Sequence, residues 1–341
     1  MITTLGGGTS MNSERPLNTT STGKGNNSPW VVYENTKGDD NGKHIVLIAG
    51  DEEYRSEEAL PMLGKILAEH HGFRCTVLFS INRDTGTIDP AEQTHIPGLH
   101  NVADADLLVL LLRFRELPDS DMKYIADHVD AGKPIIGIRT STHAFRYERN
   151  LNSPYEKYSM DSKVWPGGFG RQILGETWVS HHGHHAHEAT RGIPNQDVSD
   201  HPILRGVHDV FGPSDVYGIS ELPDDATVLL WGQVLSGMAP NSAPIQGSKN
   251  EPMMPIAWTR EINCAGKEKK MRVICSTIGA AIDLQSVDLR RMLVNACYWC
   301  LRLENAIPAQ SQVDTVGKYE PSFFGFGAFQ KGIKPEAHQS E

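Results

Sequence analysis

The sequence lacks any apolar run of about 18 residues, the length that a membrane-spanning helix requires, so no membrane association is expected. It also lacks basic character: 32 Lys and Arg stand against 42 Asp and Glu, which gives a formal net charge of −10. Because contacts to phosphate need a basic surface, this balance excludes a general nucleic-acid-binding protein. A small ligand, either neutral or anionic and locally bound, remains compatible with it.

Features of secretion are missing as well. The opening segment 1–20 has neither the basic n-region nor the apolar h-region of a signal peptide, which favours a cytoplasmic protein. A periplasmic or secreted location would apply if the chain were a mature form.

Cysteine is scarce and scattered. An odd count of five with wide spacing excludes a disulfide framework. Cys297 and Cys300 form a CxxC, but they lie three residues apart in an amphipathic helical pattern and would share one helix face. No second thiol pair accompanies them, so packing in the core is favoured over redox or metal chemistry.

The remaining composition, 39% hydrophobic and 22% charged in 341 residues, is that of an ordinary globular protein of one or two domains. Residues 1–42 are rich in Gly, Ser, Thr and Asn, which predicts a flexible N-terminal arm. One α/β domain is expected over 43–306, followed by a C-terminal tail, 307–341. The aromatic stretch FFGFGAF, residues 323–329, could clamp onto the domain or mediate association into a homo-oligomer.

Strand-like and helix-like segments alternate along the first half of the domain. The helical patterns begin near Ser56 and Pro118 and end at Gly72 and Gly132. This alternation predicts an α/β fold built on a flavodoxin-like, doubly wound and mostly parallel sheet. The expected strands are 44–50, 74–80, 107–114 and 134–140.

Residues from about 147 to 200 break this rhythm and are predicted to be a loop-rich insertion. Three strand-like runs follow, which are expected to include antiparallel pairs, and a helix over about 287–303 closes the domain. These runs cover 227–235, 255–262 and 271–279.

Open α/β sheets bind their ligands beyond the carboxyl ends of the strands, so the residues that follow each strand are candidates for a site. Acidic residues after the first strand can also simply favour a helix start, and the arginines after the third strand can pair with those acids. A ligand-binding role and such an ion pair can both hold. The candidate ligand-binding residues are Asp51, Glu52, Tyr54, Arg113, Arg115, Arg139, Asp215 and Tyr217.

The turn after the fourth strand, at Arg139, is the place where hydrolases and amidotransferases carry a nucleophile on a sharp strand-to-helix elbow. Arginine is no nucleophile, and Thr140 and Ser141 are weak candidates without a positioned base. His143 follows closely and is a candidate catalytic residue. A capped helix with a structural arginine is the alternative.

The stretch WVSHHGHHAHE, residues 178–188, holds five of the fifteen histidines. Gly183 and the lack of an apolar stripe predict a loop, and no HExxH is present. Three interpretations stay open: histidines that line a pocket as acid or base, a metal site completed by an acid such as Asp51 or Glu52, or a structural loop.

His181 and His182 follow a strand-like TWVS and are the candidate catalytic residues of this loop, together with His143. His184, His185 and His187 are expected at the surface. If a metal binds, zinc for example, the candidate ligands are His182 and His184; no other cofactor is expected.

Several segments together carry a resemblance to the ThuA-like (trehalose utilisation) family. They are GDEEYRSEEALPML, GKPIIGIRTSTHAF, GGFGRQILGETWVSHHGHHAHEATRG, HPILRGVHDVFGPSDVY, PIAWTRE and STIGAAIDLQSVDLRRMLVNACYW, in this order between about 44 and 303. The resemblance implies a fold like that of the class I glutamine amidotransferases. The elbow of those enzymes reads GxCxGxQ, and here Arg139 stands at the position of the cysteine, so glutaminase activity is not implied.

The resemblance also implies a small-molecule carbohydrate as ligand. The function expected from it is that of a hydrolase or lyase on a sugar or oxidised sugar, with a pocket lined by histidine and arginine. One alternative is a non-catalytic sugar-binding or assembly module. The other is a metal-dependent hydrolase that uses the histidine cluster.

Overall fold

Five parallel strands form the centre of the fold in the computed structural model, which describes residues 28–34 and 40–339. They are β2 (His44–Gly50), β3 (Arg74–Phe79), β4 (Leu107–Leu112), β5 (Ile135–Ile138) and β10 (Met271–Ser276). Their order in the sheet is β3-β2-β4-β5-β10, the 2-1-3-4-5 order of a flavodoxin-like fold when the five are counted along the chain. The predicted mostly parallel α/β fold is confirmed.

An antiparallel extension continues the sheet beyond β10. It consists of β9 (Met254–Ile262), β8 (Ala226–Val234), β6 (Thr190–Pro194) and β7 (Val210–Gly212), in this order. The expected antiparallel pairing is confirmed for β8 with β9 and for β9 with β10. The sequence does not predict β6, which lies in the segment 147–200, because its five residues are too few to show an alternating pattern.

The opposite edge of the sheet is β1 (Trp30–Tyr33), which pairs antiparallel with β3. These four residues fall inside the segment 1–42, so the prediction of a flexible arm is wrong for them. Residues 1–27 and 35–39 of that segment lie outside the described residues. Four strand residues between polar stretches are a weak signal, and their pairing with β3 decides the outcome.

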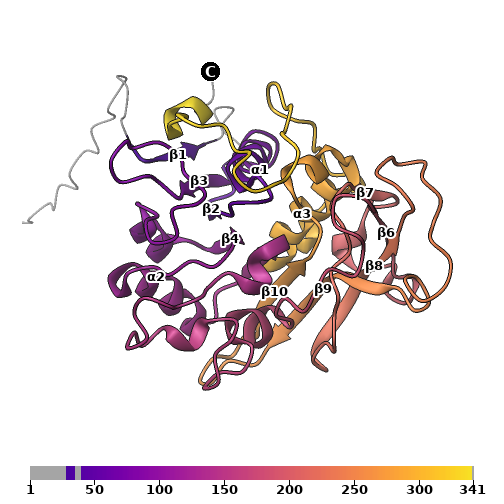
Figure 1. Ribbon diagram of the computed structural model, residues 1–341, viewed down its shortest axis with the longest axis horizontal. Coiled ribbons are helices and arrows are strands. Elements are labelled where there is room, and N and C mark those ends of the chain that lie inside the picture. Colours follow the sequence, from indigo (N-terminus) through magenta and orange to yellow (C-terminus); the bar gives the residue numbers. More distant parts are fainter. Residues whose placement is uncertain (1–27, 35–39, 340–341) are drawn as a thin grey trace, which may run out of the picture.

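Three α-helices cover the two faces of the sheet (Figure 1). Helices α1 (Ser56–His71) and α3 (Val287–Cys300) pack with one set of buried strand side chains, and α2 (Asp119–Asp130) packs with the other. Cys297 and Cys300 are buried, as the core interpretation predicts. Within the described ranges, no helix has the length and apolarity needed to cross a membrane.

Two central strands end earlier than their apolar runs suggest. β4 ends at Leu112 rather than Phe114, and β5 ends at Ile138 rather than Thr140. Phe114 and Arg139 have φ angles of 53° and 49°, which are rare for residues with a side chain. The backbone therefore turns sharply at the carboxyl ends of both strands, where a site is expected.

The tail after Ile307 returns along α1 towards β1 (Figure 1). His71 lies 2.7 Å from the carbonyl of Gln312, the Tyr319 hydroxyl donates to the carbonyl of Ala281, and the Tyr33 hydroxyl donates to the carbonyl of His338. These contacts fasten the tail to the domain on both sides of the stretch 323–329, and association through that stretch stays a prediction.

Candidate functional site

The loops after β2 and β4 meet at the point where the strand order reverses, and their charges pair there. The Glu52 carboxylate binds Arg113 with one oxygen and Arg115 with the other, the latter at 2.9 Å. Arg115 also donates to the carbonyls of Arg113, Pro90 and Glu92 and to Ser80 Oγ, and it is fully buried. Arg115 and Glu52 thus hold the two loops together, as the ion-pair alternative predicts.

Arg113 is the member of this group that stays open to a ligand. Its side chain is 18% exposed, and its guanidinium lies 4.4 Å from the Phe114 ring centroid and 5.0 Å from that of Phe326. A planar cation held between two rings has its outer N–H groups available for an anionic oxygen atom.

Asp51 shapes the loop after β2. One oxygen accepts the backbone N–H groups of Glu53 and Tyr54 at 2.6 and 2.7 Å, and the other accepts the Thr140 hydroxyl. The carboxylate is fully buried, so Asp51 positions neighbours and is not free to contact a ligand.

Arg139 occupies the elbow after β5 and is completely buried. It donates to the carbonyls of Asp215 and Thr277 at 2.7 and 2.6 Å and to the Asp215 carboxylate at 2.9 Å. Its guanidinium is sandwiched by the rings of Tyr54 and Tyr217, with centroids 4.4 and 3.8 Å away. Arg139 therefore fixes a buried carboxylate at the sharp turn after β5.

Asp215 joins two histidines to this arginine. Its Oδ2 accepts a hydrogen bond from Nδ1 of His181 at 2.7 Å, and its Oδ1 accepts one from Nδ1 of His185 at 3.0 Å. The second ring nitrogen of His185 lies 3.3 Å from a carboxylate oxygen of Glu53. Arg139, Asp215, His181, His185 and Glu53 thus form one connected charged cluster, which we call the Asp215 cluster.

Local backbone pairing brings the histidine loop, residues 178–188, to Asp215. The N–H groups of His182 and Gly183 both donate to the carbonyl of Val216, and His181 forms an antiparallel bridge with Tyr217. A Cβ at Gly183 would lie 3.1 Å from the Asp215 Cβ, so glycine permits the close approach. A single turn after it directs His185 back to Asp215.

The charge states in the cluster follow from these contacts. Burial would raise the pKa of Asp215, but Arg139 and the hydrogen bonds from His181 and His185 outweigh it and hold the pKa well below its ordinary value. The hydrogen bond to Asp215 raises the pKa of His185, against its partial burial. Burial, followed by the nearby Asp51 charge, raises the pKa of Glu53. Asp215 is therefore an ionised carboxylate that orients a histidine on each oxygen.

A small cavity of about 50 Å³ opens beside the cluster. Its lining is Glu53, Arg113, Phe114, His143, Trp178, His181 and Tyr217. His143 is buried among Phe114, Trp178 and Tyr217, and burial together with the charge of Arg113 holds its pKa well below the ordinary value. His143 is thus a neutral donor or acceptor in the wall. We call this space the edge cavity.

The candidate residues of the sequence separate into three groups. The first group lines the edge cavity and consists of His143, His181, Arg113 and Tyr217. The second group does not line it but binds the lining residues or one another, and it consists of Asp215, Arg139, Tyr54, Asp51, Glu52 and Arg115. His182 instead lies 2.8 Å from the Lys249 carbonyl, and His184 stacks on His187 at the surface, with ring centroids 4.3 Å apart. The structure does not bring the proposed metal ligands His182 and His184 into the cluster.

Two members of the cluster are not among the sequence candidates. His185 was expected at the surface, and this prediction is wrong, since its ring lies against Asp215 and Glu53. The turn that follows Gly183, in which the Glu188 N–H donates to the His184 carbonyl, returns His185 to Asp215, and no spacing rule in the sequence predicts it. Glu53 gave no signal that separated it from its acidic neighbours.

Glu57, in the first turn of α1, is a buried carboxyl group whose pKa lies above neutrality. Neither of its oxygens has a hydrogen-bond partner among the described residues, and Arg55 Nη1 lies 3.8 Å from Oε1. Burial raises the pKa of Glu57 to about 8, although Arg55 acts in the opposite direction. The folded chain thus keeps a proton that the unfolded chain releases near its ordinary pKa.

Glu57→Gln is therefore expected to increase stability at neutral and alkaline pH. The protonated Glu57 carboxyl makes its full contribution to stability below the pKa of the unfolded chain. This contribution is lost as the pH rises through the folded pKa of about 8, because the carboxylate then has to be buried with its charge. The variant should gain about 2–4 kcal/mol in unfolding free energy near pH 7.5 and close to nothing at pH 4. Urea titrations at both pH values measure this, with Glu58→Gln as the control on the same turn. An equal gain at both pH values would contradict the assignment.

The chain matches no protein-family model and no curated protein. It is similar to the crystal structure of a protein described as ThuA-like from Bacteroides uniformis, at 13% identity and a TM-score of 0.47, over 77% of this chain and 92% of that one. A second such protein, from Parabacteroides merdae, has 17% identity and a TM-score of 0.46, over 76% and 90%. PurLQS of Thermotoga maritima has 11% identity and a TM-score of 0.37, over 75% and 98%.

These likenesses concern the fold alone. They add no statement about family or activity, and the flavodoxin-like α/β core rests on the strand order of the sheet itself. What the edge cavity does has to come from its own residues.

Proposed function

We propose that the edge cavity is an acid/base site for a carbohydrate that carries a carboxylate, on which the protein acts as a hydrolase or lyase. The observation that carries the proposal is the pairing of Asp215 with His181. An ionised carboxylate on Nδ1 fixes the tautomer and orientation of the ring, and this leaves Nε2 for a proton of the substrate or of water. His181 is 37% exposed at the cavity mouth, so a substrate can reach it.

The remaining lining supports an anionic sugar as the ligand. Arg113 offers N–H groups to a carboxylate, while Phe114 and Trp178 present apolar faces of the kind on which a sugar ring can pack. In the hydrolase reaction, His181 would take a proton from a water that attacks the anomeric carbon, and the bond from that carbon to the leaving sugar oxygen would break. In the lyase reaction, it would take the proton from the carbon next to the substrate carboxylate, a double bond would form to the adjacent carbon, and the sugar oxygen on that carbon would leave. In both cases the leaving oxygen would take up a proton from His181 or from water. Arg113 would hold the charge that develops on the carboxylate oxygens in the second case.

Binding of a uronic acid and of its neutral parent sugar tests the role of Arg113. Arg113→Gln is expected to weaken binding of a uronide by about 10–100-fold, because a hydrogen bond between charged groups is lost, and to leave the neutral parent unchanged. Isothermal calorimetry with galacturonate oligomers and galactose oligomers measures both. Arg74→Gln, at the start of β3 and the opposite end of the sheet, is the control.

The same panel separates catalysis from binding. Products detected by mass spectrometry support the enzyme, whereas uronide binding without product after long incubation would favour the sugar-binding module. Equal affinity of the wild-type protein for acidic and neutral sugars would contradict the proposed substrate class.

A metal-dependent hydrolase is the second candidate, and one observation favours it. His181, His185 and Asp215 can offer ligand atoms that all lie within 4.8 Å of one another, and histidine nitrogen with carboxylate oxygen suits zinc. The guanidinium of Arg139, 2.9 Å from Asp215, opposes a cation at the same carboxylate. Elemental analysis decides between the two: stoichiometric metal in the wild-type protein, lost in His185→Ala, would replace the acid/base proposal.

A further inference from the structure

The C-terminal tail lays one aromatic side chain directly on the Asp215 cluster. Phe324 is only 6% exposed, while its neighbours Phe323 and Phe326 are 46% and 62% exposed. The Phe324 ring centroid lies 5.2 Å from that of His185 and 5.3 Å from that of Tyr54. Phe324 is thus buried against the site and belongs to a small apolar cluster separate from the two main cores.

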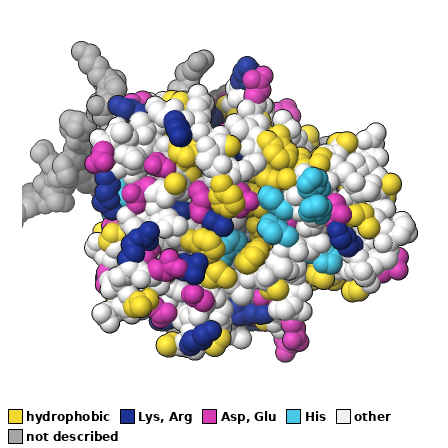
Figure 2. Space-filling view, viewed as in Figure 1, with side chains coloured by type: hydrophobic (Ala, Val, Ile, Leu, Met, Phe, Trp, Pro, Cys, Tyr) yellow, Lys and Arg dark blue, Asp and Glu magenta, His cyan; other side chains and the backbone are white. Residues whose placement is uncertain are grey.

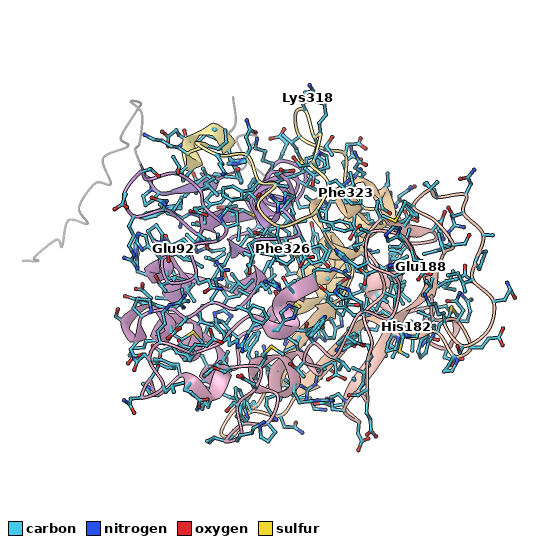
Figure 3. The ribbon with its side chains drawn as sticks, viewed as in Figure 1. Glu92, His182, Glu188, Lys318, Phe323 and Phe326 are labelled. Atoms are coloured by element: carbon cyan, nitrogen blue, oxygen red, sulfur yellow. The ribbon has the colours of Figure 1, made fainter. Side chains whose placement is uncertain are left out.

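A second tail residue covers the ligand-binding arginine. Phe326 lies 5.0 Å from the Arg113 guanidinium and remains mostly exposed on its outer side. Phe323 and Phe326 lie on the tail where it crosses the face that also carries His182 and Glu188 (Figure 3). On the surface, the histidines gather beside a hydrophobic area (Figure 2). The tail therefore contacts His185, which shares Asp215 with His181, and it also contacts Arg113, the proposed anion-binding residue.

The crossing segment is fastened at one point between two anchors. The Gly325 N–H donates to the Glu53 carbonyl at 2.8 Å, and Arg55 donates to the Gly325 carbonyl at 2.5 Å. The anchors are Ser322, bonded to Glu58, and Ile333, whose carbonyl accepts the N–H of Ile88. Gly325 and two further glycines between the anchors have positive φ, which gives the segment unusual backbone freedom.

Space around the segment permits it to move, and the site needs more space than it has. A hollow of about 280 Å³ lies between the tail and α1, and another of about 580 Å³ lies beside Phe323. The edge cavity holds about 50 Å³, far below the roughly 300–1,000 Å³ of typical ligand pockets. The segment packs on Arg113 and His185 beside this cavity but does not line it. With the segment in place the cavity is therefore too small to enclose a sugar, although His181 is exposed at its mouth.

We propose that residues 323–331 are a lid over the edge cavity and that Phe324 is its closing residue. Opening breaks the two hydrogen bonds at Gly325, lifts Phe324 from His185 and Tyr54, and frees Arg113 from Phe326. Only the identity of the ligand rests on the proposed function; the movement rests on the packing of the tail. A ligand enters when the lid is open, and closure then excludes water from the proton transfer.

Hydrogen exchange of the full-length protein, without any ligand, tests the lid. The Gly325 amide is expected to exchange at least about 100-fold faster than the amide of Val109 in β4, because local opening costs much less than global unfolding. Phe324→Ala should accelerate exchange at Gly325 by a further factor of about 10–100, since the burial of one aromatic side chain is lost. Phe323→Ala, which removes an exposed ring, should change it by less than about threefold.

Exchange of Gly325 together with Val109 would show that the tail opens only when the domain unfolds, and this would overturn the lid. Equal acceleration by Phe323→Ala and Phe324→Ala would overturn the role of Phe324. Because no sugar is present, neither result bears on the carbohydrate proposal. Conversely, a protein without activity on sugars but with a fast-exchanging Gly325 amide would refute the carbohydrate proposal and leave the lid.

Discussion

Asp215→Ala is expected to cost about 3–5 kcal/mol of unfolding free energy, the largest loss among the substitutions considered for this protein. The carboxylate is completely buried and pairs with Arg139, which is buried as well. Removal of Asp215 leaves a guanidinium without its counter-charge, held between two tyrosine rings where water cannot replace the partner. Chemical denaturation followed by circular dichroism measures the loss.

Asp225→Ala provides the matched control for this effect. The Asp225 carboxylate likewise pairs with an arginine, Arg260, here through two hydrogen bonds, but its side chain is 36% exposed. The carboxylate is partly hydrated in the folded chain, and Arg260 keeps its hydrogen bonds to the carbonyls of Gln172 and Ile173, so the cost should be smaller, about 1–2 kcal/mol. Similar losses for the two variants would show that the buried pair of Arg139 and Asp215 does not organise the site.

His181→Gln is expected to lower turnover of a uronide substrate by about 10²–10⁴-fold. The ring would supply the proton acceptor in the proposed step, and glutamine cannot replace it. Stability should change little, because the side chain is 37% exposed and glutamine can still donate a hydrogen bond to Asp215. Steady-state kinetics and thermal melting, measured on the same preparation, separate the two effects.

His184→Gln is the control for the histidine loop, since His184 lies at the surface and stacks on His187. It should keep wild-type turnover. Loss of activity in both variants would point to the shape of the loop rather than to proton transfer by His181. Full activity of His181→Gln would remove the acid/base role.

The central sheet could be predicted from the sequence because its strands are short, fully buried apolar runs separated by helices with clear end signals. The run His44–Gly50 is observed with the same bounds, and the helix expected from Ser56 ends before Gly72 as predicted. β1 and β6 could not be predicted, because neither segment has an alternating or long apolar pattern. Each is a strand because it pairs with a segment distant in sequence.

The convergence of the residues that follow the central strands could be predicted as well, but not which of them pair with each other. Residues after β2, β4 and β5 do converge, as the topology requires. Which acids form ion pairs with which arginines depends on the direction of each side chain, and the spacing of residues in the sequence does not determine that direction. Glu52 neutralises two arginines, whereas Glu53, one residue on, faces a histidine.

The histidine loop shows the same limit. The pair His181 and His182 seemed equivalent in sequence, but the bridge to Tyr217 turns His181 to Asp215 and His182 to the carbonyl of Lys249. The partner that distinguishes them is more than 30 residues away along the chain. Only tertiary structure supplies it.

The tautomer of His181 is the most direct test of the proposed acid/base pair, and ¹⁵N spectra of the histidine rings of wild-type protein can measure it. For the neutral ring, the prediction is a protonated Nδ1 that donates to Asp215 and an Nε2 without a proton. Asp215→Asn should abolish this preference. A protonated Nε2 in the wild-type protein would contradict the proposal, because the ring nitrogen that is not bonded to Asp215 could not then act as the base.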